Sequence, residues 1–569
     1  MARGSLVGTG VAFLRSLALA GLVVTSVAAR GLPQNTPSNT QEKDECSIAG
    51  MVVKLAGSEP LAKAMVHLQS MEDQTRAISM VTNAGGRFEL KGIDPGRYRL
   101  TVSRVGFVTQ EYGQRKTDDP GAVLSLRPGQ ELKGLLFRLI PSGVIAGRIL
   151  DEDGEPLPSV NVTAAREVYA DGKRTLSMGA AVETNDLGEY RLFGLSPGRY
   201  FVSAVYPRWN RSGGDEDSGS SEREQQGYAK MYYPGTADVA KAMSIALKGG
   251  EEIPSVEILL RKVLTYRIRG RVYNQITHKS GTGTNVLLMP KTNRREWDSA
   301  QQANVQRQDG SFEIPEVLPG AYVLTAFWFD EGKIYSTRMP VEVGNADVEA
   351  LAVTIAQGIN INGRIIWDGK PSLEKDELTV TPMPVDLNLI FQNSSRVSEG
   401  NFFTLKDIGE GTYHAEVGGE SKDCYIKDVH YGSSSALEDG FTVMRGAPAT
   451  LEVTISSHGA RVQGTTADKD GLPAAGVWVV LVPDLAHRAQ YRLYKTQTTD
   501  QYGRFDLRGI PPGEYKLFSW EQVELRAWED PEFLKPFEEK GEKIVLQQGD
   551  HKTLNLLTIR TRSQEESKP

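Results

Sequence analysis

The 569-residue chain has few of the residues on which most catalytic and metal sites depend. It contains two cysteines and seven histidines, and no histidine is followed three residues later by glutamate. The His-x-x-Glu pair of zinc peptidases is therefore missing. The sequence also lacks a Gly-x-Ser-x-Gly elbow and a phosphate-binding glycine loop followed by Lys-Ser or Lys-Thr. We predict no catalytic residue, no metal site, no cofactor and no enzymatic activity.

The cysteines, Cys46 and Cys424, lie far apart in the sequence. In an exported protein they could form a disulfide, provided that the chain folds back to bring them together. The alternative is two thiols that do not pair with each other.

The chain also lacks a surplus of basic residues. Its 72 acidic residues outnumber the 65 lysines and arginines, which gives a net charge of −7. A mildly acidic protein without a basic patch has no electrostatic basis for binding nucleic acid, so we exclude that partner.

Long apolar runs are missing except near the N-terminus. Arg3 and Arg15 precede an apolar run from Ser16 to Ala29 that ends in Val-Ala-Ala. This pattern predicts a secretory signal peptide over residues 1–29, with an uncleaved anchor as the alternative. After its removal we expect no transmembrane segment, and a location in the periplasm, at the cell surface or outside the cell. Residues 30–44 are polar and predict a disordered linker.

The chain does contain a repeated stretch with the pattern of two strands. Phe88 and Leu90 alternate with polar residues, as do Tyr98 and Leu100, and a Pro-Gly turn lies between the two runs. Four similar stretches follow; the fourth copy is the weakest, with Gly400, Phe402, Ile408 and Tyr413 matching. The turn glycines of the five copies are Gly96, Gly198, Gly320, Gly411 and Gly513.

Two further elements recur around each copy. A strand with an internal glycine opens each unit, as in Ile48 to Val53, and an alternating apolar strand closes it, as in Leu135 to Leu139. Helical periodicity of useful length is missing. These features predict an all-β fold, a tandem array of five small antiparallel sandwiches. We predict repeats at 45–141, 142–263, 264–357, 358–458 (divergent) and 459–562, an acidic Gly/Ser insertion at 208–224, and a polar tail at 563–569.

The repeated pattern Gly-x-Phe/Tyr-x-Leu-x-Gly-Ile/Leu-x-Pro-Gly-x-Tyr resembles the carboxypeptidase regulatory-like domain. The resemblance implies a seven-stranded, prealbumin-like sandwich, a fold grouped with carbohydrate-binding-like domains. It concerns the regulatory domain and not the catalytic one. The linking segments are similar to those of multi-repeat secreted proteins of soil bacteria.

Two groups of side chains could bind a ligand. Aromatic residues beside the insertion and in the third repeat could stack on sugar rings, or could simply cap the sandwich cores; they are Trp209, Tyr228, Tyr232, Tyr233 and Trp328. The acidic runs Asp151 to Gly154 and Asp468 to Gly471 could hold calcium, but more simply form Asp/Gly turns.

The sequence therefore predicts a secreted or envelope-associated, non-catalytic scaffold or interaction protein. The alternative is a carbohydrate-binding protein that uses exposed aromatic residues. A polysaccharide or an envelope protein is the expected partner, and the sequence leaves the oligomeric state open.

Overall fold

A computed structural model describes residues 45–560, apart from 74, 118, 171, 207–225, 292–299, 331–332, 374–376, 386–393 and 448. The predicted signal peptide, the linker 30–44, the insertion 208–224 with Trp209, and the polar tail lie outside the described residues. The described residues belong to one compact unit, Asp44–Pro569.

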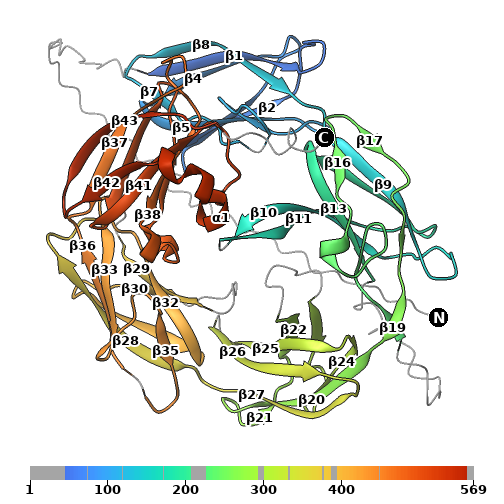
Figure 1. Cartoon of the computed structure of the whole chain (residues 1–569). Helices are drawn as coiled ribbons and strands as arrows, with labels where there is room; N and C mark the ends of the chain where they lie inside the picture. Colours follow the sequence, from blue (N-terminus) through green and yellow to red (C-terminus); the bar gives the residue numbers. More distant parts are fainter. Residues whose placement is uncertain are drawn as a thin grey trace, which may run out of the picture. The chain divides into compact units, whose positions relative to one another are not determined.

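These residues are almost entirely β-structure, which confirms the all-β prediction (Figure 1). The one α-helix among them, α1 (Pro531–Leu534), has four residues. Five hydrophobic clusters follow the five repeats in order, and two sheets contribute to each. A sixth cluster lies in the fifth repeat and includes Tyr169 of the second. The tandem sandwich architecture is therefore present, while the domain boundaries given above remain predictions.

The elements of the first three repeats are as follows. The first repeat has β1 (Cys46–Lys54), β2 (Met65–Ser70), β3 (Ala77–Val81), β4 (Arg87–Ile93), β5 (Gly96–Ser103), β6 (Gln110–Glu111), β7 (Leu124–Leu126) and β8 (Glu131–Leu139). The second has β9 (Gly143–Leu150), β10 (Asn161–Ala170), β11 (Lys173–Glu183), β12 (Glu189–Leu195), β13 (Gly198–Val205), β14 (Gln226–Tyr228), β15 (Met231–Tyr232), η1 (Val239–Lys241), β16 (Ile245–Leu247), β17 (Glu252–Ile253), β18 (Ile258–Leu259) and β19 (Lys262–Leu264). The third has β20 (Tyr266–Asn274), β21 (Lys279–Ser280), β22 (Asn285–Pro290), β23 (Gln301–Asn304), β24 (Ser311–Val317), β25 (Gly320–Asp330), β26 (Lys333–Val343) and β27 (Val348–Ile355).

The last two repeats follow the same order. The fourth has β28 (Ile359–Asp368), β29 (Thr379–Pro384), β30 (Ser395–Arg396), β31 (Phe402–Ile408), β32 (Gly411–Gly418), β33 (Tyr425–Tyr431), β34 (Ser434–Ser435), β35 (Phe441–Val443) and β36 (Leu451–Ser456). The fifth has β37 (Ala460–Ala467), β38 (Trp478–Pro483), η3 (Leu485–His487), η4 (Tyr491–Leu493), β39 (Lys495–Thr498), β40 (Arg504–Ile510), β41 (Gly513–Trp520), η5 (Ala527–Glu529), α1, η6 (Lys535–Lys540), β42 (Glu542–Leu546) and β43 (His551–Leu557).

The fifth repeat shows the sandwich in its simplest form, with sheets β40-β37-β43 and β39-β38-β41-β42. Most neighbouring strands are antiparallel, as expected, but the opening and closing strands of each repeat are parallel. These parallel pairs are β1 with β8, β9 with both β17 and β18, β20 with β27, β28 with β36, and β37 with β43. The sequence did not reveal these parallel pairs, because the alternation of side chains is the same in parallel and antiparallel strands.

The glycine inside each opening strand is required by a close approach of its neighbours. A Cβ on Gly464 would overlap the carbonyl oxygen of Leu554 on the parallel strand β43, and one on Gly50 would overlap the carbonyl oxygen of Leu135 and crowd the Phe88 ring. The same obstruction is found at Gly147, Gly270 and Gly363. The repeated glycine is thus a packing requirement of the parallel pair.

The repeated tyrosine has an equally structural role. Tyr98 is nine-tenths buried, and its hydroxyl donates a hydrogen bond of 2.8 Å to the carbonyl of Asp94, four residues earlier. The other four repeats have the same bond, from Tyr200 to Ser196, Tyr322 to Leu318, Tyr413 to Gly409 and Tyr515 to Pro511. Burial raises the pKa of Tyr515 to about 12, so its hydroxyl keeps the proton that it donates.

In the fourth repeat, the structure shifts the predicted alignment of the weakest copy by one residue. Phe403 is buried against Gly363, whereas Phe402 is 62% exposed. The turn residue that corresponds to Gly310 is Asn401, because Asn401 and not Gly400 has positive φ and accepts the bond from the opening strand. Asparagine tolerates this left-handed conformation, which explains why the glycine pattern failed here.

The fourth repeat also carries an added strand. Its opening sheet has the order β31-β28-β36-β33-β34, so that β33 pairs antiparallel with the closing strand β36 (Figure 1). In the fifth repeat the closing strand β43 has β37 as its one partner strand among the described residues.

Cys46 and Cys424 are buried in two different hydrophobic clusters and are not joined to each other. The Cys424 thiol lies 3.6 Å from the carbonyl of Ser372, and burial raises its pKa. Of the two alternatives, the structure shows thiols without a mutual disulfide.

Candidate functional site

The predicted aromatic residues that the structure describes are largely engaged in packing. Tyr232 is 4% exposed, and Tyr228 and Tyr233 pack against the core of the second repeat. Trp328 is half-buried in the third repeat, with its ring centroid 5.7 Å from that of Tyr335. Trp209 lies outside the described residues. The structure thus places Tyr228, Tyr232 and Tyr233 in the second repeat and Trp328 in the third.

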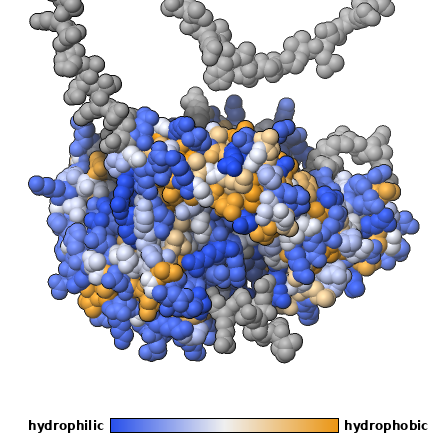
Figure 2. All heavy atoms as spheres, turned by 90° about the horizontal axis from the view of Figure 1, so that it is seen from above, coloured by the Kyte–Doolittle hydropathy of each residue, from blue (hydrophilic) through white to orange (hydrophobic). Residues whose placement is uncertain are grey.

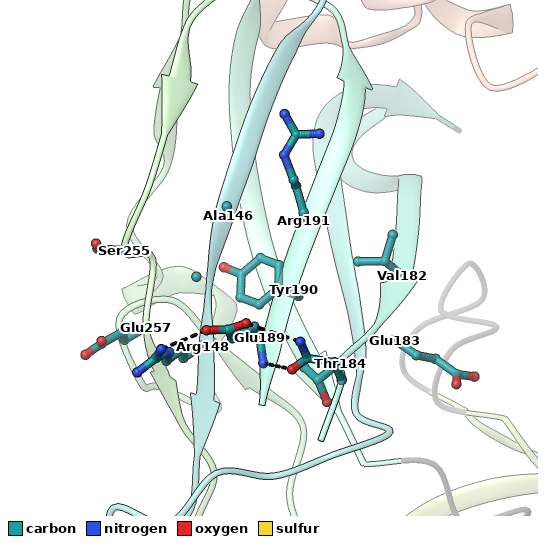
Figure 3. A pocket seen from close by; sticks show the side chains of 12 residues that line it. Ala146, Arg148, Val182, Glu183, Thr184, Glu189, Tyr190, Arg191, Ser255 and Glu257 are labelled. Atoms are coloured by element: carbon teal, nitrogen blue, oxygen red, sulfur yellow. Dashed lines mark hydrogen bonds and ion pairs between the residues drawn. The ribbon is translucent and has the colours of Figure 1, made fainter. Parts of the chain in front are cut away.

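The second repeat contains an open groove of about 750 Å³ that the sequence did not reveal (Figure 3). Strands β9 and β12, the end of β11 and the segment before β18 contribute to its walls. Its lining exposes polar and apolar surface in about equal measure and carries charges of both signs; the charged members are Arg148, Glu183, Glu189, Arg191 and Glu257.

Arg148, Glu189 and Asn185 form a hydrogen-bonded group in this groove. The Arg148 guanidinium donates to Glu189 at 2.7 Å, and the Asn185 side-chain amide donates to the other Glu189 oxygen at 3.2 Å. Hydrogen bonds from Arg148 and then Asn185 hold the pKa of Glu189 below its ordinary value. Figure 3 shows the Arg148 and Glu189 side chains next to each other, joined by a dashed line. Since the ion pair is half-exposed, it contributes little to stability and is accessible to a ligand.

The repeat pattern itself positions this group. Tyr190 takes the place of the core phenylalanine of the first repeat, and its hydroxyl donates to the carbonyl of Val256 at 2.8 Å. Burial raises the Tyr190 pKa, so the hydroxyl stays protonated. Gly147 allows Val256 to approach β9, and Ser255 adopts a φ of +64° beside it. Arg148 follows Gly147 on β9, and Glu189 precedes Tyr190 on β12. Because side chains alternate along a strand, both charged side chains point toward solvent.

The chemistry available in the groove is hydrogen bonding with paired charges. Guanidinium, carboxylate, amide and hydroxyl groups bind polar ligands such as sugars. Among the described residues, the structure contains no group of three or more His, Cys, Asp or Glu side chains that could hold a metal ion. In the acidic runs, the Asp151 side chain accepts from the backbone of residues 153 and 155, and that of Asp468 from residues 470 and 472, which is Asx-turn geometry.

A second notable feature is an aromatic cluster in the fifth repeat that receives a side chain from the second. Phe518 and Trp520 stack at 4.8 Å, and the segment from Val523 to Phe537 covers this face of the sheet. Tyr169, at the tip of the β10–β11 hairpin, completes the cluster, with its ring 5.9 Å from that of Phe533. Arg174 donates to the Tyr169 hydroxyl at 2.9 Å.

The first and fifth repeats also contact each other. The Gln501 side chain accepts from the Ser125 amide at 2.9 Å and donates to the Ser125 carbonyl at 2.7 Å, as a neighbouring strand would. Beside it, Val123 forms a parallel bridge with Asp500, and the Arg127 guanidinium lies 5.6 Å from the centre of the Tyr502 ring. No local sequence signal predicts contacts between residues so far apart.

The surface is predominantly hydrophilic on the face shown in Figure 2, where hydrophobic residues form separate patches. None of the helices in the described part of the chain is long and apolar enough to span a membrane.

Comparisons with known proteins agree with the resemblance of the first repeat. Residues 47–131 match the family of the carboxypeptidase regulatory-like domain. No curated protein matches the chain. Similar solved structures include the Bacillus anthracis TIE protein (14% identity, 55% of this chain and 50% of that one, TM-score 0.16) and a streptococcal ancillary pilin (12% identity, 55% and 98%, TM-score 0.18). Another is the minor pilin of Streptococcus agalactiae (13% identity, 39% and 97%, TM-score 0.21). The chain thus spans about half the length of the Bacillus anthracis protein, and the fold assignment depends on the sheets described above.

Proposed function

We propose that the protein is an exported, non-catalytic scaffold whose β-sandwich repeats present surfaces to other molecules of the cell envelope or exterior. Residues 47–131 match the family of the carboxypeptidase regulatory-like domain, and the resemblance concerns that regulatory domain rather than the catalytic one. The signal-like residues 1–29 support export.

The observation that carries this proposal is the structural use of every repeated residue. The repeated glycine admits the parallel strand, the repeated tyrosine bonds its own turn, and the aromatic residue between them fills the core. A catalytic repeat would instead preserve polar side chains that converge on a cleft. The fifth repeat also contacts the first and the second. These contacts support a scaffold, because they hold together sandwiches that are distant in sequence.

Carbohydrate binding is a second candidate, and the groove of the second repeat favours it. Its Arg148–Glu189–Asn185 group offers donors and acceptors of the kind that bind sugar hydroxyls. Trp209, Tyr228, Tyr232 and Tyr233 belong to the same repeat in sequence, and Trp328 to the next. Because Tyr232 is almost fully buried, it is not available to stack on a sugar.

One binding experiment separates the two candidates. Purified residues 30–569 are titrated onto envelope fractions that are untreated, protease-treated or periodate-oxidised, and bound protein is measured after sedimentation. A scaffold that binds an envelope protein should show saturable binding that protease abolishes. Binding that survives protease and is lost after periodate would favour the carbohydrate candidate, and no saturable binding would overturn both.

Matched variants locate a carbohydrate site if the second outcome is found. Arg148→Ala removes the groove arginine, while Arg271→Ala removes the corresponding exposed arginine of the third repeat, which pairs with Asp309. A groove site predicts weaker binding for Arg148→Ala alone, and Trp209→Ala tests the aromatic prediction separately. Equal binding by Arg148→Ala and Arg271→Ala would exclude the groove.

A further inference from the structure

The closing strand β43 of the fifth repeat has an uncommonly regular outer edge. Its register with β37 runs without interruption from His551, opposite Arg461, to Leu557, opposite Ala467. Among the described residues, β37 is the one strand that pairs with it. Most of its seven side chains are exposed, including Leu557 at 73%.

Three other repeats interrupt the same edge. A residue with positive φ breaks the closing segment at Gly134 in the first repeat, Ser255 in the second and Ala350 in the third. In the first and third repeats the register with the opening strand shifts at this point. Bulges of this kind prevent an exposed edge from pairing with another strand. The fifth repeat has no such interruption in β43.

The fourth repeat shows what covers a regular closing strand. Its β36 also pairs without a shift, and β33 lies antiparallel along its outer edge, with His430 opposite Glu452 and Asp428 opposite Thr454. Superposition of the registers through Gly363 and Gly464 makes Glu452 equivalent to Asn555 and Thr454 equivalent to Leu557. The positions that β33 occupies in the fourth repeat are therefore open in the fifth.

The backbone of β43 presents the groups that a further strand needs. The carbonyl of Asp550 accepts from Arg461 and the amide of Thr558 donates to Ala467, so these even-numbered residues face β37. Since backbone groups alternate in direction along a parallel strand, the amides and carbonyls of Thr553, Asn555 and Leu557 point away from β37.

We infer that β43 pairs antiparallel with β43 of a second copy of this chain. Two identical edges related by a twofold axis always run antiparallel, which is the sense in which β33 covers β36. With the axis at Leu554, all seven residues pair: Thr553 lies opposite Asn555 of the second copy, and Lys552 opposite Leu556. This register places no like charges opposite each other. The inference names a partner for the proposed scaffold but does not depend on what else the scaffold binds.

A proline variant tests this pairing without breaking the sandwich. In Asn555→Pro the lost amide is one that points away from β37, and proline is tolerated at sheet edges. Asn555→Ala is the matched control, because it loses the same hydrogen bond from Thr465 but keeps the amide. Hydrogen–deuterium exchange of peptides from β37 and β40 verifies that both variants remain folded.

Sedimentation velocity of residues 30–569 over a concentration series gives the readout. We expect a concentration-dependent monomer–dimer equilibrium for the unsubstituted chain and Asn555→Ala, and a monomer throughout for Asn555→Pro. The pairing is overturned if the unsubstituted chain is monomeric at every concentration, if it forms species larger than a dimer, or if folded Asn555→Pro dimerises equally well. A monomeric result would leave the scaffold proposal to the envelope-binding experiment, so the two can fail separately.

Discussion

Replacing Gly147 with alanine tests the structural role of the repeated glycine. The new Cβ would overlap the Val256 carbonyl oxygen and lie 2.5 Å from its carbon and 2.8 Å from its amide nitrogen. Carbon atoms in contact normally lie about 3.5–4.0 Å apart, so β9 and the Val256 segment would have to separate by roughly 1 Å. All three obstacles are backbone atoms, which cannot rotate away as a flexible side chain can.

The magnitude follows from two losses. Overpacking a close-packed site costs about 1–3 kcal/mol, and the rigid backbone places this site at the upper end. Separation of the strands also weakens the 2.8 Å bond from Tyr190 to Val256, worth about 1 kcal/mol. We therefore expect the free energy of unfolding of the second repeat to fall by about 3 kcal/mol or more, and the corresponding calorimetric transition by about 12 °C or more.

Gly344→Ala is the control. A Cβ there would have no other heavy atom within 4 Å, and the glycine does not require positive φ. We expect its effect to remain within about 0.5 kcal/mol. Hydrogen–deuterium exchange should rise in peptides 143–150 and 252–260 of Gly147→Ala alone. Equal transition temperatures for the two variants would refute the close-approach explanation.

Three further substitutions extend the account. Asp407 has a φ of +56°, and within the described part of the chain its buried Oδ1 lacks a hydrogen-bond partner. Asp407→Gly should therefore stabilise the fourth repeat by about 1 kcal/mol, as measured by calorimetry. A lower transition temperature would contradict this expectation. Tyr413→Phe removes the hydrogen bond to Gly409 and should destabilise the same repeat by about 1 kcal/mol. The control Tyr273→Phe, at a residue 46% exposed, should have little effect. Similar losses of stability in both variants would argue against the role of the tyrosine hydroxyl in holding the turn. Burial raises the pKa of Asp506, but hydrogen bonds from Arg461 and Arg508 outweigh it and hold the pKa below 3.8, so this stabilisation is present at neutral pH and is lost as the pH falls through the lowered value. Asp506→Asn should therefore cost about 1.5–3 kcal/mol at pH 7 and progressively less below pH 3.8, as measured by thermal unfolding across pH; a cost independent of pH would contradict the assignment.

The sequence predicted the parts of the fold that local periodicity encodes. Alternation located the strands around Phe88 and Tyr98, and each of the turn glycines begins a strand, as the repeated pattern predicted. It misplaced the fourth copy by one residue because Phe402 and Phe403 are adjacent, and the pattern fits either when asparagine replaces the turn glycine. It could not show that the closing strand is parallel, since alternation carries no direction.

The candidate sites were less accessible to prediction. The aromatic residues of the second repeat were singled out by their chemistry, yet Tyr232 is buried, in a strand that pairs with β13. The groove depends on Arg148 and Glu189, which are ordinary surface residues until β9 and β12 bring them together. The contact of Gln501 with Ser125 and that of Tyr169 with Phe533 join residues far apart in sequence, so no local pattern marks them.

The central claim is that an exported chain holds distant repeats together as a scaffold. The most direct measurement uses Ser125→Cys with Gln501→Cys, expressed in the producing cell with and without residues 1–29 and analysed by non-reducing mass spectrometry. An exported protein with the observed contact should form this disulfide within one chain, because the two positions adjoin and the compartment is oxidising. The version without residues 1–29 should keep both thiols reduced. Reduced thiols in both versions, or a disulfide that forms only between chains, would contradict the account.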